Sequence, residues 1–581
     1  MTLLIVIIPI ASIMMLFFSK EEPEESSFEN LELATISKNK SRYLPGDSAQ
    51  FHAHLTQKPN QPITYIISYF HLGQKIDEQS IHVTSQEFDW SWQTPEKDYQ
   101  GYYVKVSRIN HRNQEKTIAV DVSSTWTKFP RYGFLSDFSN IDRKHQEEIV
   151  GKLSRYHING IQFYDWQDEH HLPLKMDGNK PLSSWANIAN QPVDFQTIEN
   201  YIDLAHSKNI NAMSYNLLNG SLAGAENENV NQEWYVYTDP NQDQVDNHQL
   251  PDQWKSDIYL MNPGHSQWQD YIMEQQKRVF EHLDFDGWHL DQLGDRGDVF
   301  DSEGQRIKLK EAYPGFLNHA SGQFMDKSLI MNAVNQYGQK QIADSLVPFL
   351  YTEVWDPYKT YQDLQQILKE NHQTFEKPSV LAAYMNYKMS DQEGGFNGPG
   401  ILYTDALIFA QGGGHLELGE HMLSKEYFPH NKLDMSEDLQ DSLIAYYDYM
   451  VAYQNLLRDR VQETELEIKS SDWVQLSSQP EKGKIYAFAK QRADKKMIHF
   501  LNYMDVEHMN WRDTNGTQNS AVMRETLSVT IQESKQVKKV WVSSPDWNEG
   551  MAETIDFSQE GDHLQFTIPK IKYWDMVVLE Y

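Results

Sequence analysis

The stretch Asp284-Phe-Asp-Gly-Trp-His-Leu-Asp-Gln-Leu-Gly294 carries the clearest sign of the fold class. Successive side chains of a strand point to opposite faces, so His289 and Asp291 share one face and Trp288 and Leu290 share the other. Asp291 therefore closes an inward-facing row at the end of the strand. In a (β/α)8 barrel, reacting groups stand at this position.

Outward from this strand, short apolar segments alternate with amphipathic ones between Phe129 and about Asp459. This is the pattern of repeated βα units around a parallel sheet. Strands are predicted at Tyr132–Asp137, Gly160–Tyr164, Asn211–Asn216, Gly287–Asp291, Ser328–Asn332, Phe349–Glu353, Val380–Asn386 and His415–Leu418. Helices are predicted at Arg143–Tyr156, Phe195–Lys208, Gln267–His282, Tyr361–Asn371 and Ser436–Leu457. Eight strands over about 330 residues favour a (β/α)8 TIM barrel with loop insertions over an open sheet.

Two β-rich regions flank this barrel. Period-two alternation runs through segments such as Ile63–Phe70 and returns after Asp459, for example at Ile485–Ala489. The sequence thus predicts a multidomain chain. Residues 31–125 form an N-terminal, immunoglobulin-like β-sandwich, residues 126–459 form the catalytic barrel, and residues 460–581 form a C-terminal antiparallel β-sandwich.

Residues 1–19 are an apolar run, and residues 20–30 are rich in Glu and Ser and are typical of a linker. The run is a targeting segment, either a cleaved signal peptide or a retained membrane anchor. We therefore expect an extracellular protein, secreted or anchored to the membrane. The chain has no cysteine, which excludes disulfides, thiolate metal sites, a cysteine nucleophile and a lipoprotein anchor.

The formal net charge of −32 disfavours polyanionic partners, because most of the surface repels nucleic acid and anionic membranes. A neutral polymer such as a glucan meets no such repulsion. The 15 Trp and 32 Tyr residues are an unusual load of rings, which suit flat ligands such as sugars, although most of these rings are expected in cores and on sheet faces.

Polar side chains end nearly every predicted barrel strand. They are Asp137, Asp165, Tyr215, Asn216, Asp291, Asn332, Glu353, Asn386, His415 and Glu417. One such residue means little, but a ring of them from separate strands indicates a site. The alternative for Asp291 is a cap on the following helix, and Asp286 fits that structural role better.

Glu353 lies in Pro348-Phe-Leu-Tyr-Thr-Glu-Val-Trp-Asp356, with apolar residues before it and an aromatic ring after it. Such neighbours disfavour the charged form of a carboxyl and raise its pKa, as a general acid near neutral pH requires. The alternative is a buried glutamate paired with a base, but the motif contains none. Glycoside cleavage needs one carboxyl to protonate the leaving oxygen and another to attack C1 or activate water. Asp291 and Glu353 are candidates for this pair.

The segment Gly160-Ile-Gln-Phe-Tyr-Asp-Trp-Gln-Asp-Glu-His-His171 packs rings, carboxylates and imidazoles into the loop after the second strand. Rings stack on sugar faces while carboxylates and imidazoles bind hydroxyls, so this loop is expected to bind substrate. A metal site is the rival interpretation. The histidines and carboxylates here lack a recognisable ligand spacing, so neither a metal nor another cofactor is expected.

The sequence supports neither a phosphate loop, nor a serine nucleophile, nor a calcium loop. Gly412-Gly-Gly-His-Leu-Glu-Leu-Gly-Glu-His421 lacks the Lys-Ser/Thr of a phosphate loop, and its glycines precede a strand rather than a helix. The chain also has no Gly-x-Ser-x-Gly elbow to support serine hydrolysis, and no ordered acidic loop for Ca²⁺.

With these motifs in hand, the chain resembles the bacterial dextranase and cycloisomaltooligosaccharide glucanotransferase family, glycoside hydrolase family sixty-six. The resemblance spans Phe129 to about Asp459 through motifs in one order. They are Tyr132-Gly-Phe-Leu-Ser-Asp137, Gln162-Phe-Tyr-Asp-Trp-Gln167, His170-His171, Ala212-Met-Ser-Tyr-Asn-Leu-Leu218, Phe285-Asp-Gly-Trp-His-Leu-Asp291, Asn332-Ala-Val-Asn-Gln-Tyr-Gly338, Tyr351-Thr-Glu-Val-Trp355, Ala383-Tyr-Met-Asn386 and Gly413-Gly-His-Leu-Glu-Leu-Gly-Glu420.

The resemblance implies an endo-acting, retaining attack on α-1,6-linked glucan such as dextran. Asp291 would be the nucleophile and Glu353 the acid/base, with their carboxyl groups about 5 Å apart. The residues implied to hold the sugar are Tyr164, Asp165, His170, Tyr215, Asn332, Trp355, Asn386 and His415. We expect a monomer acting on α-1,6-glucan, with no nucleic-acid partner.

The family contains both hydrolases and cyclising transferases. Transferase members resemble one another in carrying a carbohydrate-binding module late in the barrel, and the gap between predicted strands seven and eight is too short for one. This favours a dextranase that releases isomalto-oligosaccharides. The alternatives are a cycloisomaltooligosaccharide glucanotransferase, a non-catalytic surface glucan-binding protein, and a metal-dependent barrel hydrolase.

Overall fold

The computed structural model describes residues 31–109, 115–470 and 474–581. The predicted targeting segment and linker, residues 1–30, lie outside the described residues. Within the described part, no helix is long and apolar enough to cross a membrane.

The first 90 or so described residues form two antiparallel sheets. One sheet has the order β1–β2–β5, comprising β1 (Leu33–Lys38), β2 (Ser48–Leu55) and β5 (Glu87–Gln93). The other has the order β4–β3–β6–β7, comprising β4 (Gln74–Val83), β3 (Ile63–His71), β6 (Gln100–Arg108) and β7 (Glu115–Val122). Side chains alternate between buried and exposed along β2 and β5. The buried faces share one core, in which Tyr69 of the second sheet stacks on Trp92 of the first at 4.4 Å between centroids.

All eight predicted strands of the central region are present and pair in parallel. One sheet contains β8 (Tyr132–Leu135), β9 (Gly160–Phe163), β14 (Asn211–Leu217), β18 (Gly287–Asp291) and β21 (Ser328–Met331). A second contains β22 (Leu350–Glu353), β23 (Ser379–Ala382) and β25 (Gly414–His415). A parallel bridge between Asn332 and Tyr351 joins the two sheets. At the other side, the Phe134 N–H donates to the Leu418 carbonyl at 3.1 Å, so the first strand contacts the segment after the last.

The strands at the end of this series are shorter than predicted. β23 ends at Ala382 instead of Asn386, because Asn386 has φ of +52° and its N–H donates to Arg512 of a distant segment instead of to a ladder. β25 keeps only two ladder residues, Gly414 and His415.

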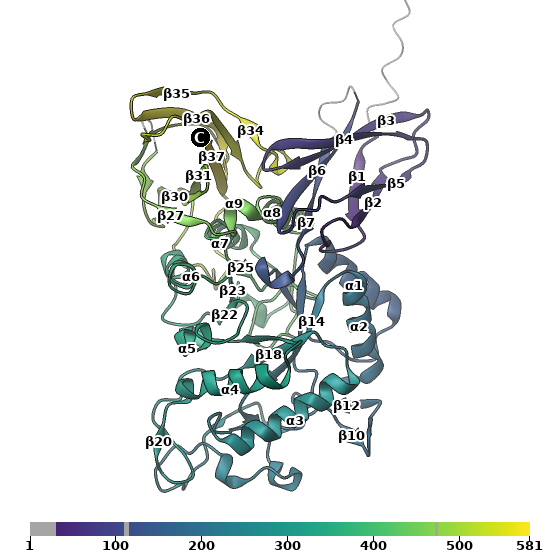
Figure 1. The fold of residues 1–581 in the computed structure, drawn as a ribbon, viewed down its shortest axis with the longest axis vertical. Coiled ribbons are helices and arrows are strands. Elements are labelled where there is room, and N and C mark those ends of the chain that lie inside the picture. Colours follow the sequence, from purple (N-terminus) through teal and green to yellow (C-terminus); the bar gives the residue numbers. More distant parts are fainter. Residues whose placement is uncertain (1–30, 110–114, 471–473) are drawn as a thin grey trace, which may run out of the picture.

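Helices cover these strands (Figure 1). They are α1 (Arg143–Arg155), α2 (Phe195–Ser207), α3 (Ser266–His282), α4 (Leu309–Gln323), α5 (Gln339–Ala343), α6 (Tyr361–Phe375), α7 (Gly398–Ala410), α8 (Glu437–Ala452) and α9 (Gln454–Leu457). The five predicted helices are confirmed, the last of them divided into α8 and α9. Helices α4, α5 and α7 were not predicted from the sequence. Nearly all of α7 is buried, so it lacks the polar face that makes a helix visible in a sequence.

Smaller hairpins and ribbons decorate the loops. They are β10 (Met176–Asp177) with β11 (Lys180–Pro181), β12 (Ser184–Ala186) with β13 (Pro192–Asp194), β15 (Gly220–Ser221) with β17 (Ile258–Leu260) and β16 (Asn247–His248), β19 (Val299–Phe300) with β20 (Arg306–Ile307), and β24 (Gly394–Gly395) with β26 (Leu433–Asp434).

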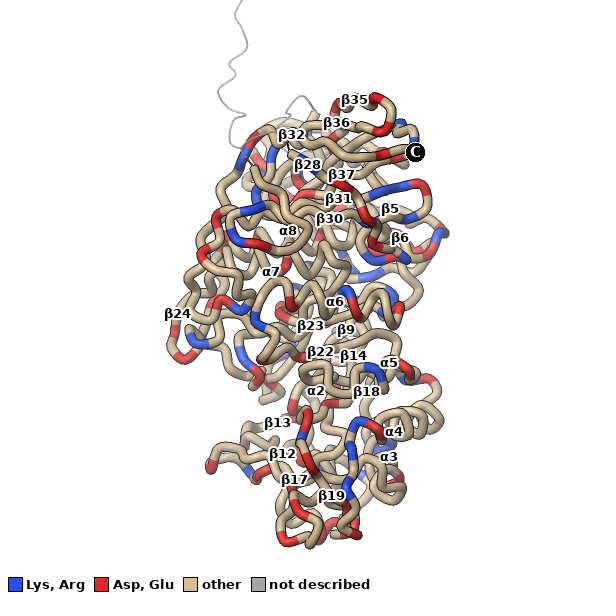
Figure 2. The backbone as a smooth tube through the Cα atoms, turned by 90° about the vertical axis from the view of Figure 1, so that its left-hand side faces the viewer, with Lys and Arg blue, Asp and Glu red and all other residues tan. Residues whose placement is uncertain are grey.

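The C-terminal region forms two further sheets. The larger contains β27 (Gln462–Thr464), β30 (Ile485–Arg492), β31 (Lys495–Asn502), β37 (Trp574–Glu580), β33 (Lys539–Ser543), β34 (Glu553–Thr554) and, beside β30, β29 (Leu476–Ser477). The smaller contains β28 (Ile468–Ser470), β32 (Arg524–Gln532), β36 (His563–Ile571) and β35 (Phe557–Glu560). Figure 1 shows these sheets and the N-terminal sheets side by side at one end of the molecule, beyond α8 and α9. In the view of Figure 2, basic and acidic positions are interspersed along the chain.

A buried ion pair joins the N-terminal sheets to the central strands. Arg131, just before β8, donates from Nη2 to Asp121 of β7 at 2.6 Å, and both side chains are 0% exposed. The other carboxylate oxygen of Asp121 accepts from Ser123 and from Gln454 of α9. The pair therefore ties three parts of the chain together.

We expect Asp121→Asn to destabilise the protein by about 3 kcal/mol, because it leaves the Arg131 charge buried without a counter-ion. Urea unfolding followed by circular dichroism measures this loss. Asp89→Asn, in an exposed pair with His52, is the matched control and should cost less than about 1 kcal/mol. Equal stability of the two variants would contradict this role of the Asp121 pair.

Candidate active site

Two carboxylates meet at the C-terminal ends of β18 and β22. Asp291 is the last residue of β18, Glu353 is the last residue of β22, and Asn332 follows the intervening strand β21. The Asn332 side-chain nitrogen donates to Asp291 Oδ1 at 2.8 Å and to Glu353 Oε2 at 3.2 Å. Because both distances start at one nitrogen, these two oxygens lie at most about 6 Å apart, the sum of 2.8 and 3.2 Å.

Asp291 is surrounded by donors. Its Oδ2 accepts from the Tyr215 hydroxyl at 2.7 Å, and its Oδ1 also accepts from the Gln292 N–H at 2.8 Å. Burial raises the pKa of Asp291, while the hydrogen bonds from Tyr215, Asn332 and Gln292 oppose that rise. These donors stabilise the ionised form.

Glu353 is the partner that retains a proton. Burial raises the pKa of Glu353 to about 7, and the negative charge of Asp291 adds to the rise. The Tyr384 hydroxyl donates to Glu353 Oε1 at 2.7 Å and opposes the shift in part. Two nearby carboxyl groups titrate as a pair, and the better-solvated or better-bonded member ionises first. Here that member is Asp291, so as the pH falls through about 7 the pair takes up its first proton on Glu353.

The loop after β9 brings a third carboxyl to the same place. Asp165 is buried with φ of +48°, and burial raises its pKa to about 7, the Asp291 charge adding to the effect. His170 lies nearby, with Nδ1 2.9 Å from the Asn216 side-chain oxygen. The ring of Tyr164 stacks on Phe428 at 4.1 Å and contacts Tyr215 at 4.9 Å. These side chains line one side of the carboxylate pair.

Trp355 and Asn386 lie on the opposite side, after β22 and β23. The Trp355 ring lies 5.4 Å from that of Tyr384 and 5.9 Å from that of Tyr387. Asn386 is fully buried, and its side-chain nitrogen donates to the Asp513 carbonyl at 2.8 Å. Its amide thus holds a segment of the C-terminal region beside the strand ends.

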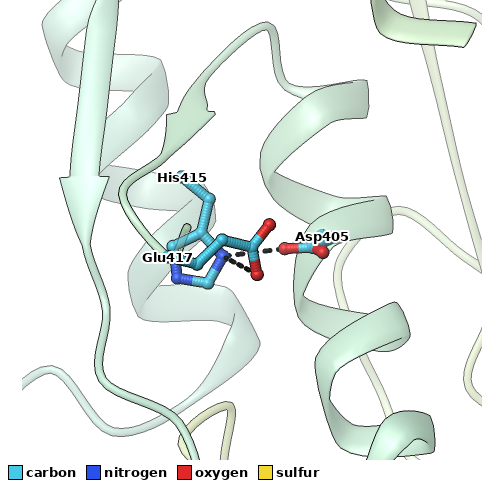
Figure 3. Close-up of side chains that lie close together, drawn as sticks. All are labelled: Asp405, His415 and Glu417. Atoms are coloured by element: carbon cyan, nitrogen blue, oxygen red, sulfur yellow. Dashed lines mark hydrogen bonds and ion pairs between the residues drawn. The ribbon is translucent and has the colours of Figure 1, made fainter. Parts of the chain in front are cut away.

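His415 lies in a buried cluster with Asp405 and Glu417 (Figure 3). Its Nε2 lies 2.9 Å from the Ala383 carbonyl, which can only accept, so Nε2 carries the proton. Its Nδ1 lies 2.7 Å from Asp405 Oδ1 on α7 and 3.3 Å from Glu417 Oε2. The structure therefore brings His415 against the backbone next to Tyr384, with its side chain 0% exposed.

Asp405, His415 and Glu417 offer ligand atoms within 4.8 Å of one another. A cation between them is a poor fit, because Nδ1 and Oδ1 already stand at hydrogen-bond distance and the group is closed to solvent. Burial raises the pKa of both Asp405 and Glu417 well above the usual range, which favours shared protons over two free charges. The cluster fits a structural role that joins β25 and α7.

A cavity of about 1060 Å³ lies at the opposite ends of the strands. Its lining includes Lys128, Pro348 and Gly412, which precede β8, β22 and β25. It is remote from Asp291 and Glu353, which stand at the C-terminal strand ends where barrel enzymes place their chemistry.

Sequence reasoning missed several residues of this site. Tyr384 follows β23 within the quoted motif Ala383–Asn386, so the strand-end rule could have identified it. Phe428 and Glu426 lie in the long loop after β25, where the Glu426 carbonyl accepts from Tyr164 and its carboxylate from Tyr387. No local pattern marks those loop residues, because their contacts come from distant segments.

Comparison with known proteins places the chain in a sequence family. The profile described as glycosyl hydrolase family 66 matches residues 38–578. A cycloisomaltooligosaccharide glucanotransferase from Niallia circulans is 23% identical over 698 residues, covering 93% of this chain and 72% of the relative. A dextranase from Streptococcus salivarius is 23% identical over 563 residues, covering 83% of this chain and 67% of the relative.

A solved structure shares the fold. A cycloisomaltooligosaccharide glucanotransferase from Paenibacillus sp., complexed with cycloisomaltoheptaose, superposes with a TM-score of 0.89 at 22% identity, over 94% of this chain and 99% of that chain. The family profile itself covers far more than half of the sequence. The chain therefore belongs to glycosyl hydrolase family 66 and is an enzyme of the glycoside hydrolase type.

Proposed function

We propose that the eight parallel strands close into a (β/α)8 TIM barrel. The strand order follows the chain, and contacts join the residue after β21 to β22 and β8 to the segment after β25, which supports closure. In this proposal residues 126–459 are the barrel, residues 31–125 an immunoglobulin-like sandwich and residues 460–581 a C-terminal sandwich.

We propose that the enzyme cleaves α-1,6-glucan with retention of configuration. The observation that carries this proposal is the single Asn332 amide that donates to both carboxylates. An inverting pair needs roughly 6.5–9.5 Å between its carboxyl groups to admit a water, whereas a retaining pair stands about 5–5.5 Å apart. The upper limit imposed by Asn332 favours retention.

The two roles follow from the hydrogen bonds. Asp291, held ionised by three donors, attacks the anomeric carbon while Glu353 protonates the departing glycosidic oxygen. Formation of the ester removes the charge of Asp291, so the pKa of Glu353 falls and Glu353 becomes the base that deprotonates the incoming water. Water then breaks the ester and releases a product of the original configuration.

The surrounding side chains suit a neutral sugar. In this proposal Tyr164 and Trp355 offer ring faces, while Asp165, His170 and Tyr215 bind hydroxyls next to the cleaved bond. Asn386 and His415 support the backbone on either side of Tyr384.

We propose hydrolysis of dextran in an endo manner, with cyclisation as the second candidate. The dextranase among the relatives favours the first, and the cycloisomaltooligosaccharide glucanotransferases favour the second. The alignment with the glucanotransferase runs over 698 residues against the 581 of this chain, so that relative carries residues that have no counterpart here. The 31 residues between β23 and β25 are accounted for by α7, β24 and their loops, which supports the hydrolase.

We expect linear isomalto-oligosaccharides when the full chain is incubated with dextran, and none from Asp291→Asn or Glu353→Gln, which remove the nucleophile and the acid. Mass spectrometry of the products measures both. Asp295→Asn, an exposed carboxylate four residues from Asp291, is the matched control and should stay active. Products that lack one water would favour cyclisation, and intact dextran with the wild type would contradict glycosidase activity.

The configuration of the first products is a separate test. Proton NMR during the first minutes of dextran cleavage should show α-anomeric reducing ends before mutarotation, because two displacements at C1 restore the configuration. Initial β-anomers would require an inverting mechanism and would contradict the close pairing of Asp291 and Glu353.

The pH profile should report the Glu353 proton. With a raised pKa of about 7, Glu353 is protonated below that pH, so kcat/KM for dextran should fall as the pH rises through about 7. Tyr384→Phe removes a hydrogen bond that lowers the pKa of Glu353, so the basic limb should move to higher pH. Tyr581→Phe is the control, since the Tyr581 hydroxyl donates to Glu533 in the C-terminal region. A basic limb that stays in place in Tyr384→Phe would refute the assignment.

A further inference from the structure

A segment of the C-terminal region reaches into the candidate site. Residues 505–518, between β31 and β32, lie along the loops after β22 and β23. The Asn386 N–H donates to the Arg512 carbonyl at 2.8 Å, and the Lys388 N–H donates to the Thr514 carbonyl at 3.0 Å. On the other side the Trp511 indole donates to the Tyr358 carbonyl at 2.8 Å. The 505–518 segment is thus bonded to two adjacent catalytic-end loops.

The 505–518 segment is also braced from within. Asp513 is buried, and its Oδ1 accepts from the Thr517 N–H at 2.7 Å. Its Oδ2 accepts from the Asn397 side chain, next to α7, at 2.8 Å. A Cβ at Gly400 would lie 2.5 Å from that carboxylate, so the segment and the helix fit closely. The residue next to Asp513 is therefore held at a fixed position.

That residue is Arg512, and its side chain points at the rings of Trp355 and Tyr387. The guanidinium carbon lies 4.9 Å from the ring centroid of Trp355 and 5.3 Å from that of Tyr387, within cation–π range. Nη2 donates to the Val354 carbonyl at 2.8 Å. Nη1 is buried and has no partner among the residues that the structure describes. Arg512 thus contacts both the Val354 carbonyl and the Trp355 ring, which follow Glu353 in the chain.

Trp355 lies between Arg512 and Glu353 and links the two. The Trp355 side chain stands two residues after Glu353 and is among the groups that lower the pKa of the Glu353 carboxyl. The Trp355 N–H donates to the Asn335 side chain at 2.7 Å, which leaves the ring to be held by its neighbours. The charged and titratable groups that face Arg512 are Tyr384 and Tyr387 after β23, Glu426 after β25 and Asp356 after β22.

We propose that Arg512, supplied by the C-terminal β region, is a positioning residue that orients Glu353 through Trp355. The proposal rests on the proposed acid/base role of Glu353. It makes the C-terminal region part of the site instead of an accessory fold. A residue that aligns an acid matters most where the leaving group needs protonation, since misalignment of about 1 Å can cost about 100-fold in rate.

The test compares two substrates in the full-length wild type, Arg512→Met and Arg512→Lys. Dextran needs its leaving oxygen protonated, whereas a 4-nitrophenyl isomalto-oligoside loses a nitrophenolate that needs little help. We expect Arg512→Met to lower kcat/KM for dextran about 10- to 100-fold, with a much smaller loss on the nitrophenyl substrate. Arg512→Lys should recover part of the dextran activity, because it keeps the charge but not the planar fork.

Two further readouts separate positioning from folding. The basic limb of the dextran pH profile should move upward in Arg512→Met, because a displaced Trp355 side chain no longer lowers the pKa of Glu353. Arg492→Met, which breaks the pair with Asp459 elsewhere in the C-terminal region, controls for general loosening and should change Tm without changing the substrate ratio.

The outcomes are distinct. Equal losses on both substrates in Arg512→Met and Arg512→Lys, with an unmoved pH limb, would overturn the positioning role and leave the proposed function intact. A wild type that cleaves neither substrate would overturn the proposed function and the role of Arg512 with it.

Discussion

The site depends on one amide that holds two partly buried carboxyl groups together. Asp291 and Glu353 end strands that are not neighbours, and Asn332 leaves the strand between them. Neighbouring strands lie roughly 4.8 Å apart, so the two acids come close only by leaning over the intervening strand end. The Asn332 nitrogen accommodates both, and its oxygen accepts from the Glu353 N–H at 3.2 Å. Side chain and backbone of the acid are therefore fixed by the same residue.

Two acids in so little water cannot both be ionised at low cost, and the surrounding polar groups decide which one holds the proton. Asp291 accepts three hydrogen bonds, one of them from a backbone N–H that cannot rotate away. Glu353 keeps the proton next to the rings of Trp355 and Tyr384. In the mechanism that we propose, this asymmetry reverses once Asp291 is esterified, so a single arrangement would serve both halves of a double displacement.

Two groups of residues support this arrangement, a buried cluster around His415 and Arg512 of the C-terminal region. The cluster of Asp405, His415 and Glu417 binds the Ala383 carbonyl, and the next residue, Tyr384, donates to Glu353. On the outer side, Arg512 binds the Val354 carbonyl, one residue after Glu353. Each of these contacts acts on backbone next to a side chain at the C-terminal ends of the strands.

Much of the fold and the centre of the candidate site could be predicted from local sequence. Period-two alternation ending in a polar residue identified all eight parallel strands, Asp291 and Glu353 among their ends, because strand geometry and strand exit are properties of a few consecutive residues. The buried helix α7 could not be found this way, since a helix without a polar face has no periodic signal. The hydrogen bond from Tyr384 to Glu353, the contact of His415 with Asp405 and the bond from Arg512 to Val354 join residues 10 to 158 positions apart, and only the folded chain brings such groups into contact.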